Sequence, residues 1–153
     1  MVSFEVFELE GGPKLLVREV MDEPVAPPRR KLTVEAIHNR AVDEGVGAPF
    51  DRFVAMARDA GLAVQPQRAS VRIAPPQNRT RFLMYAQPRS GDKGGELYIE
   101  VGPKQFSEFF PHISQTEAED ALRDVHGKSL GGEDLDEQLD RIEQFLNEKV
   151  RTG

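Results

Sequence analysis

The sequence predicts an α+β fold in which helices pack on one face of an antiparallel meander of at least three strands. Two observations support this prediction: segments of alternating polarity follow one another along the chain, and helical patterns flank them on both sides. The strands are expected at residues 68–73, 80–87 and 96–101. Turn-forming residues at 75–78 and 88–95 separate them, so a hairpin followed by a hairpin is the simplest connection.

A separate β-hairpin is expected at the N-terminus, with arms at residues 2–9 and 14–20 around a Gly-Gly-Pro turn. Residues 22–31 contain three prolines, which favour an extended connector because proline continues neither helix nor ladder. The expected organisation is therefore a hairpin appendage at 1–21, a proline-rich linker at 22–31 and a single α+β domain at 32–153. An isolated two-stranded hairpin is marginal in water, so it is expected to dock on its own domain or on a second copy, giving a homodimer.

Helices are expected over residues 33–44 and 49–60, before the strands, and over 115–126 and 133–150, after them. Thr33 and Gly45 mark the ends of the first helix, and Ser114 with Glu117 forms a capping box. Phe106 to Phe110 form an aromatic turn that Pro111 ends. The last helix carries a short apolar heptad seam, which is expected to pack on the parent domain, with a dimer contact as the alternative. The seam consists of Leu135, Leu139, Ile142 and Leu146.

Alternation along the three central strands places their apolar side chains on one face. In the simplest register Val71 faces Phe82, and Met84 faces Ile99. Phe82, Met84 and Ile99 are then the expected centre of the core. The full apolar face consists of Ala69, Val71, Ile73, Phe82, Met84, Ala86, Leu97, Ile99 and Val101.

The same register gives the opposite face a basic and aromatic character. Arg72 falls opposite Arg81, and like charges across a ladder are mildly destabilising, by about 0.2–1 kcal/mol. Either Glu100, a helix end or solvent neutralises the pair, or the two arginines form an anion site. Arginine mixed with tyrosine suits desolvated interfaces and base stacking. The candidate ligand-binding residues are Arg68, Arg72, Arg79, Arg81, Tyr85 and Tyr98.

Charge is unevenly distributed along the chain. The 153 residues carry a formal net charge of −6, which argues against a protein dedicated to coating nucleic acid. Residues 64–104 nevertheless hold seven basic and three acidic side chains, so this segment is +4 and the remainder is −10. Such a distribution can steer an acidic ligand to one face.

Several kinds of chemistry and location are not expected from this sequence. Without cysteine there is no disulfide, thiolate metal site or cysteine nucleophile. The histidines lack metal-ligand spacing, and Gly91 to Gly95 does not match a Walker A loop, so no metal or cofactor is expected. No signal-like N-terminus or membrane-length apolar run occurs, so we expect a cytoplasmic protein without membrane contact.

The order helix, three antiparallel strands and helix over residues 49–126 is similar to that of double-stranded RNA-binding domains. In those domains the final helix begins with lysines that contact phosphates. The matching segment here, residues 115–120, is acidic and would repel an RNA backbone. We therefore assign no family on this basis.

Two functional hypotheses follow from the sequence. The first is a non-catalytic binding domain whose Arg/Tyr sheet face contacts an acidic partner, either nucleic acid or protein. The second is a small enzyme with a pocket near the end of the sheet that uses His112, Glu100 and the arginines. The first is favoured because no nucleophile, acid/base pair or metal cluster stands out.

Overall fold

A computed structural model describes residues 4–7, 15–18, 32–92 and 94–151. The chain divides into two compact units, Met1–Lys31 and Leu32–Gly153. The first unit contains strands β1 (Phe4–Phe7) and β2 (Leu15–Arg18), which pair antiparallel. The residues that would connect them, and the expected linker at 22–31, lie outside the described residues. The N-terminal hairpin as a whole therefore remains a prediction.

The second unit has an α+β fold, as predicted, built on a five-stranded sheet in the order β3-β4-β5-β6-β7. Every neighbouring pair is antiparallel, which confirms the meander. The two edge strands, β3 and β7, were not predicted, because they are too short to show an alternating pattern. The strands are β3 (Ala63–Pro66), β4 (Val71–Ala74), β5 (Met84–Gly91), β6 (Gly94–Val101) and β7 (Lys128–Leu130).

Helices occur close to the predicted positions. The Thr33 hydroxyl accepts the Ala36 N–H at the start of the first helix, and both hydrogen bonds of the Ser114–Glu117 capping box are formed. Gly45 and Gly61 adopt positive φ after the first two helices. The helices are α1 (Val34–Asp43), α2 (Gly47–Asp59), α3 (Pro103–Phe109), α4 (Gln115–Leu122) and α5 (Gly132–Phe145), the last continuing as a π-helix, η1 (Leu146–Val150).

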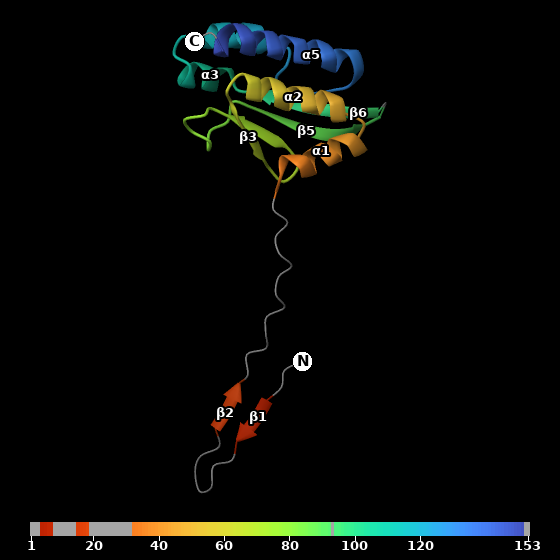
Figure 1. The fold of residues 1–153 in the computed structure, drawn as a ribbon, viewed down its shortest axis with the longest axis vertical. Coiled ribbons are helices and arrows are strands. Elements are labelled where there is room, and N and C mark those ends of the chain that lie inside the picture. Colours follow the sequence, from red (N-terminus) through yellow and green to blue (C-terminus); the bar gives the residue numbers. More distant parts are fainter. Residues whose placement is uncertain (1–3, 8–14, 19–31, 93, 152–153) are drawn as a thin grey trace. The chain divides into compact units, whose positions relative to one another are not determined.

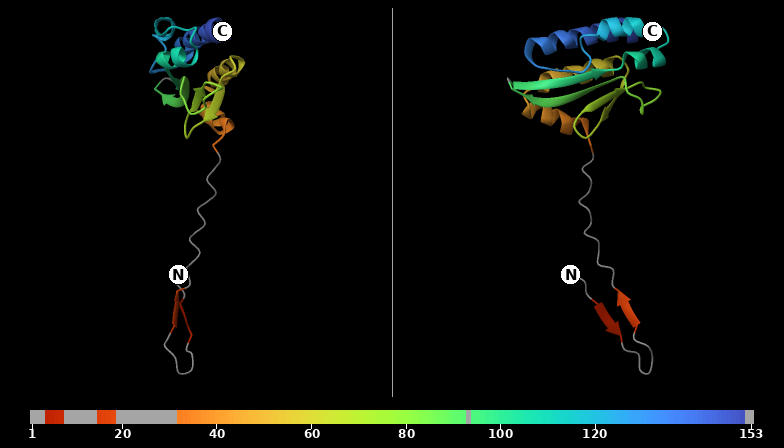
Figure 2. Two further views of the ribbon diagram at one scale, coloured as in Figure 1. Left: turned by 90° about the vertical axis from the view of Figure 1, so that its left-hand side faces the viewer. Right: turned by 180° about the vertical axis from the view of Figure 1, so that it is seen from behind.

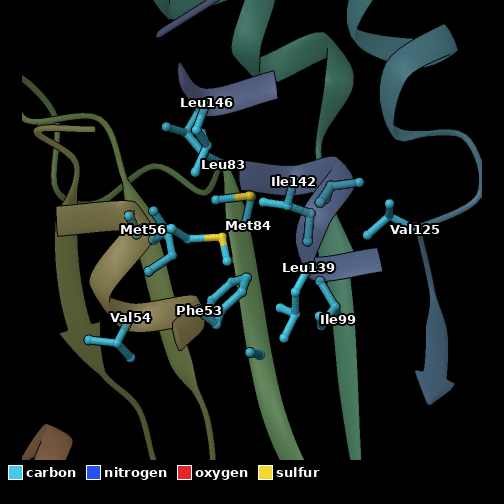
Figure 3. Close-up of a cluster of buried hydrophobic side chains, with 14 of the residues drawn as sticks. Phe53, Val54, Met56, Leu83, Met84, Ile99, Val125, Leu139, Ile142 and Leu146 are labelled. Carbon is cyan, nitrogen blue, oxygen red and sulfur yellow. The ribbon is translucent and has the colours of Figure 1, made fainter. Parts of the chain in front are cut away.

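The core lies between the helices and one face of the sheet. Seen from behind in Figure 2, the strands lie in front of α1 and α2, so these helices cover the opposite face (Figure 1). Phe53 of α2 points toward the sheet beside Met84 of β5 (Figure 3), and both are fully buried. The heptad seam of the last helix is also buried within the unit, as expected. Arg52 joins α2 to α5 at the surface through ion pairs with Asp140 and Glu143, each at 2.5 Å.

The strand register differs from the predicted one. Val71 lies opposite Ala86 rather than Phe82, and Met84 lies opposite Val101 rather than Ile99. The shifts are four and two residues. Because side chains alternate with period two, an even shift keeps every strand residue on its predicted face.

Phe82 is not part of the core, which corrects the predicted centre. It precedes β5, is half-buried, and its ring lies 5.7 Å from the ring of Tyr85. Leu83 takes its place in the interior and is fully buried. The Leu83 N–H donates to the Ile73 carbonyl at 2.9 Å, and its own carbonyl accepts the Gly102 N–H at 2.8 Å. These two bonds hold the chain so that Leu83 faces inward and Phe82 outward.

Among the described residues, no helix combines the length and the apolar character that crossing a membrane requires.

Candidate functional site

The sheet face opposite the core carries polar and aromatic side chains that are half-buried, and we call it the outer face. Strand alternation places its members in two rows across the sheet. In one row Gln65, Arg72, Tyr85 and Glu100 are successive cross-strand neighbours, and in the other Gln87 lies opposite Tyr98. The outer face is defined by Gln65, Arg72, Tyr85, Gln87, Tyr98 and Glu100.

Arg72 is anchored incompletely. Its Nη2 donates to Gln65 Oε1 at 2.8 Å, and its Nη1 donates to the Thr80 carbonyl at 3.4 Å. Its Nε is buried and has no hydrogen-bond partner among the described residues. Buried N–H groups are nearly always bonded in folded proteins. The guanidinium of Arg72 therefore has bonding capacity to spare.

The expected pairing of Arg72 with Arg81 is wrong. The register puts Tyr85 opposite Arg72. Arg81 lies in the connection before β5, where its Nη2 is 3.9 Å from Glu108 Oε1 of α3, and both side chains are exposed. An exposed pair at that distance contributes little to stability. The like-charge repulsion that suggested an anion site is thus absent from this position.

Three aromatic rings form a continuous group on this side of the sheet. The ring centres of Phe82 and Tyr85 are 5.7 Å apart, and those of Tyr85 and Tyr98 are also 5.7 Å apart. The guanidinium of Arg89 lies over the Tyr98 ring, 4.1 Å from its centre. Tyr98 also donates its hydroxyl to Glu100 Oε2 at 3.2 Å. We call Phe82, Tyr85, Tyr98 and Arg89 the stacking row.

Burial, followed by the hydrogen bonding and charge of Glu100, raises the pKa of Tyr85 well above its ordinary value. The Tyr85 hydroxyl therefore stays protonated throughout the physiological range. It is a hydrogen-bond donor and acceptor on the outer face, not an anion.

A hollow of about 240 Å³ adjoins the stacking row, between the β3–β4 connection and β5. Its walls combine two aromatic rings with four polar side chains. The lining residues are Gln67, Ser70, Arg72, Phe82, Tyr85 and Gln87. Phe82, the residue expected in the core, is thus a wall of the candidate site.

Of the six predicted site residues, the structure brings three together on the outer face: Arg72, Tyr85 and Tyr98. Arg68 lies in the β3–β4 connection and Arg79 in the β4–β5 connection, both exposed. Neither forms an ion pair with another residue that the structure describes. With Arg81, they place three exposed cations in the loops next to the hollow.

Sequence reasoning missed Gln67, Ser70, Phe82, Gln87 and Arg89 as site residues. Gln87 and Arg89 were expected at the end of a strand and in a loop, whereas β5 extends to Gly91 and pairs closely with β6. One sequence feature could have predicted this longer strand. In the Gly91-Asp92-Lys93-Gly94 segment two glycines flank two residues, a pattern that suits a tight hairpin turn and lets the strands continue up to it.

The residues of the enzyme hypothesis have separate partners. His112 Nε2 donates to the Lys149 carbonyl at 2.6 Å, and its ring packs edge-on against Phe110. Glu100 instead accepts the Tyr98 hydroxyl on the outer face. Within the described part of the chain, no cluster of three or more His, Cys, Asp or Glu residues could hold a metal ion.

Comparison of the chain with protein families, with curated proteins and with solved structures finds no match.

Proposed function

We propose that this protein is a non-catalytic binding domain that contacts an acidic partner through the outer face, and that the partner is single-stranded nucleic acid. The stacking row supports the proposal: three neighbouring rings and an arginine guanidinium lie on a half-buried sheet face. Bases stack on aromatic rings and on guanidinium planes whatever their sequence.

Nucleic acid fits this face better than an acidic protein surface does. Carboxylate side chains have no ring to place on Tyr85 or Tyr98, whereas every base offers a flat π-face. The exposed cations Arg68, Arg79 and Arg81 beside the hollow suit a phosphate backbone. Residues 64–104, which contain the outer face, carry +4, whereas the rest of the chain carries −10, and this contrast favours binding of a polyanion at the outer face.

The proposal is one of binding because the groups suggested for catalysis are engaged elsewhere. His112 donates to a helix carbonyl, and Glu100 accepts the hydroxyl of a stacking-row tyrosine. Binding through the outer face requires no rearrangement of these two side chains. A cytoplasmic location, where single-stranded RNA is abundant, belongs to the same proposal.

Fluorescence polarisation of labelled single-stranded oligonucleotides tests this function, with duplex DNA and heparin as competitors over a salt series. We expect binding that weakens as salt rises and that single strands compete for better than heparin. Arg81→Gln should weaken binding and lower the salt slope by about one. The matched control is Arg123→Gln at the C-cap of α4, an exposed arginine paired with Asp120, which should leave binding unchanged.

Absence of binding at low salt would refute the proposal. Stronger competition by heparin than by single strands would show charge recognition without base stacking, which points to an acidic protein partner and overturns the nucleic-acid assignment. An equal effect of Arg81→Gln and Arg123→Gln would show that binding is spread over the surface and does not use the outer face.

We also propose that the N-terminal segment mediates self-association. The heptad seam of the last helix is buried within its own unit and is not available for that purpose. The expected hairpin at 1–21, joined by a proline-rich segment, is then the candidate for exchange between copies.

A further inference from the structure

The hollow beside the stacking row holds an arginine whose bonding is unfinished. Of the three guanidinium nitrogens of Arg72, Nη2 bonds to Gln65 at 2.8 Å and Nη1 makes a long bond of 3.4 Å to the Thr80 carbonyl. Nε has no hydrogen-bond partner in the described part of the chain. At 3.4 Å the Nη1 bond is the weaker of the two, so a ligand can replace it at little cost. An acceptor placed in the hollow could then bond to Nε–H and to a neighbouring Nη, as an arginine fork prefers.

The other residues that line the hollow indicate which chemical group carries that acceptor. Phe82 and Tyr85 supply aromatic surface, and Ser70, Gln67 and Gln87 supply polar groups at the rim. Gln87 Oε1 accepts a bond of 3.5 Å from Arg89. At about 240 Å³ the hollow lies below the range of roughly 300–1,000 Å³ that holds drug-sized ligands. It suits one planar ring with acceptors on its edge.

We propose that this hollow binds a single nucleobase, with a base carbonyl oxygen or ring nitrogen accepting the hydrogen bonds of Arg72 and the ring packed against Phe82 and Tyr85. This inference rests on the proposed function and specifies it: the stacking row holds bases regardless of identity, and the hollow recognises the edge of one base. Arginine bonding two acceptors on a base edge is a common mode of base recognition.

A base fits the hollow better than a phosphate group does. Glu100 is the cross-strand neighbour of Tyr85, and its carboxylate would repel a phosphate dianion. Among the described residues that line the hollow, Arg72 alone is charged. A phosphate would leave the two aromatic walls unused, whereas a base covers them.

NMR titration of the full chain with nucleosides and, separately, with inorganic phosphate tests the inference. Adenosine, guanosine, cytidine and uridine carry bases without phosphate. We expect at least one of them to shift the Arg72 Nε–H signal and the amide signals of Ser70 and Gln87. Phosphate at the same concentration should leave those three signals in place.

Two matched substitutions complete the test. Arg72→Lys keeps the positive charge and removes the planar fork, so nucleoside affinity should fall roughly tenfold or more. Arg123→Lys makes the same chemical change at an exposed arginine that pairs with Asp120 and does not line the hollow, so it should leave nucleoside affinity unchanged. Because Arg72 contacts Gln65, the fold of the Arg72→Lys variant is checked by the amide spectrum, and Phe82→Leu provides a second variant that removes a ring wall without altering charge.

The outcomes separate this inference from the proposed function. Oligonucleotide binding without nucleoside-induced shifts would overturn the base pocket and leave the stacking row. Nucleoside shifts without oligonucleotide binding would support the pocket and overturn the polymer partner. Equal shifts with phosphate would show a general anion site, and equal losses for Arg72→Lys and Arg123→Lys would show binding that does not use the hollow; either result would overturn the inference.

Discussion

Arg89 covers the face of the Tyr98 ring, with its guanidinium carbon 4.1 Å from the ring centre. The two residues are diagonal neighbours across β5 and β6, since Gln87 lies opposite Tyr98 and Arg89 lies opposite Glu96. An exposed contact of this kind contributes about 0.5–1 kcal/mol. Its position extends the aromatic group of Phe82, Tyr85 and Tyr98 by one more flat surface.

Replacing Tyr98 with leucine should weaken binding of a single-stranded oligonucleotide by about 1–3 kcal/mol, because a stacking surface and the support for Arg89 are lost together. Tyr98→Phe keeps the ring and removes only the hydroxyl that bonds Glu100, so it should bind nearly as wild type does. Fluorescence polarisation compares the three proteins. If the phenylalanine and leucine variants lose the same affinity, the ring is not used for stacking.

Replacing Phe53 with alanine should lower the free energy of unfolding by about 3–5 kcal/mol, because a fully buried ring in the centre of the core is removed and a cavity remains. Chemical denaturation measures the change. Phe82→Ala is the control. Because the Phe82 ring is half-buried on the outer side of the sheet, its removal should lower the free energy of unfolding clearly less. If Phe82→Ala lowers the free energy of unfolding as much as Phe53→Ala does, Phe82 is a core residue after all.

The capping box of α4 should make stability depend on pH at acid values. The Ser114 N–H donates to Glu117 Oε2 at 3.0 Å, and the Lys149 ammonium donates to Glu117 Oε1 at 3.1 Å. In return the Glu117 N–H donates to the Ser114 hydroxyl oxygen at 3.2 Å. The backbone N–H and side chain of Ser114, followed by Lys149, lower the pKa of the Glu117 carboxyl group from 4.5 to about 2. Because the folded-state pKa is depressed, the stabilisation is complete above pH 4.5 and is lost as the pH falls toward about 2.

Thermal unfolding of wild type and Glu117→Gln across that pH window measures this effect. The wild type should be more stable at pH 6, and the difference should shrink as the carboxylate is protonated. Glu119→Gln on the same helix, outside the box, is the control and should show a smaller pH-dependent difference. If the difference in thermal stability between wild type and Glu117→Gln stays constant down to pH 2, Glu117 does not have the lowered pKa assigned to it.

Removal of residues 1–30 should reduce self-association if the N-terminal segment exchanges between copies. Sedimentation of the full chain and of a chain that begins at Lys31 gives both masses directly. We expect the full chain to sediment as a dimer and the shortened chain, which retains the compact unit Leu32–Gly153, as a monomer. Identical monomeric behaviour of both would exclude the hairpin as an interface.

The sequence predicted which face each central strand presents, but not how the strands are aligned. Val71, Met84 and Ile99 are buried as expected, although their partners differ. A period-two pattern distinguishes odd shifts from the correct register, since an odd shift exposes the apolar face. It cannot distinguish shifts of two or four residues. The tight turn at Gly91 and Gly94 sets the register of β5 with β6, and the connection over residues 75–83 sets that of β4 with β5.

The alignment in turn decided how much of the candidate site could be predicted. Arg72, Tyr85 and Tyr98 were correctly assigned to the face opposite the core, because that assignment needs only alternation. The neighbours of Arg72 required the register, so Arg81 was expected where Tyr85 lies. Phe82 was misplaced because it precedes β5 and does not follow the alternation of that strand, and its outward position depends on the backbone bonds of Leu83.

The short edge strands restrict how a partner can approach this sheet. β3 has four residues and ends in Pro66, which has no N–H to donate, and β7 has three residues. A peptide or second sheet that adds as a new strand needs a long row of free backbone groups, and neither border of this sheet provides one. A partner of the proposed kind would therefore be recognised by side chains across the strands, and its specificity could be changed at single positions without altering the backbone that carries them.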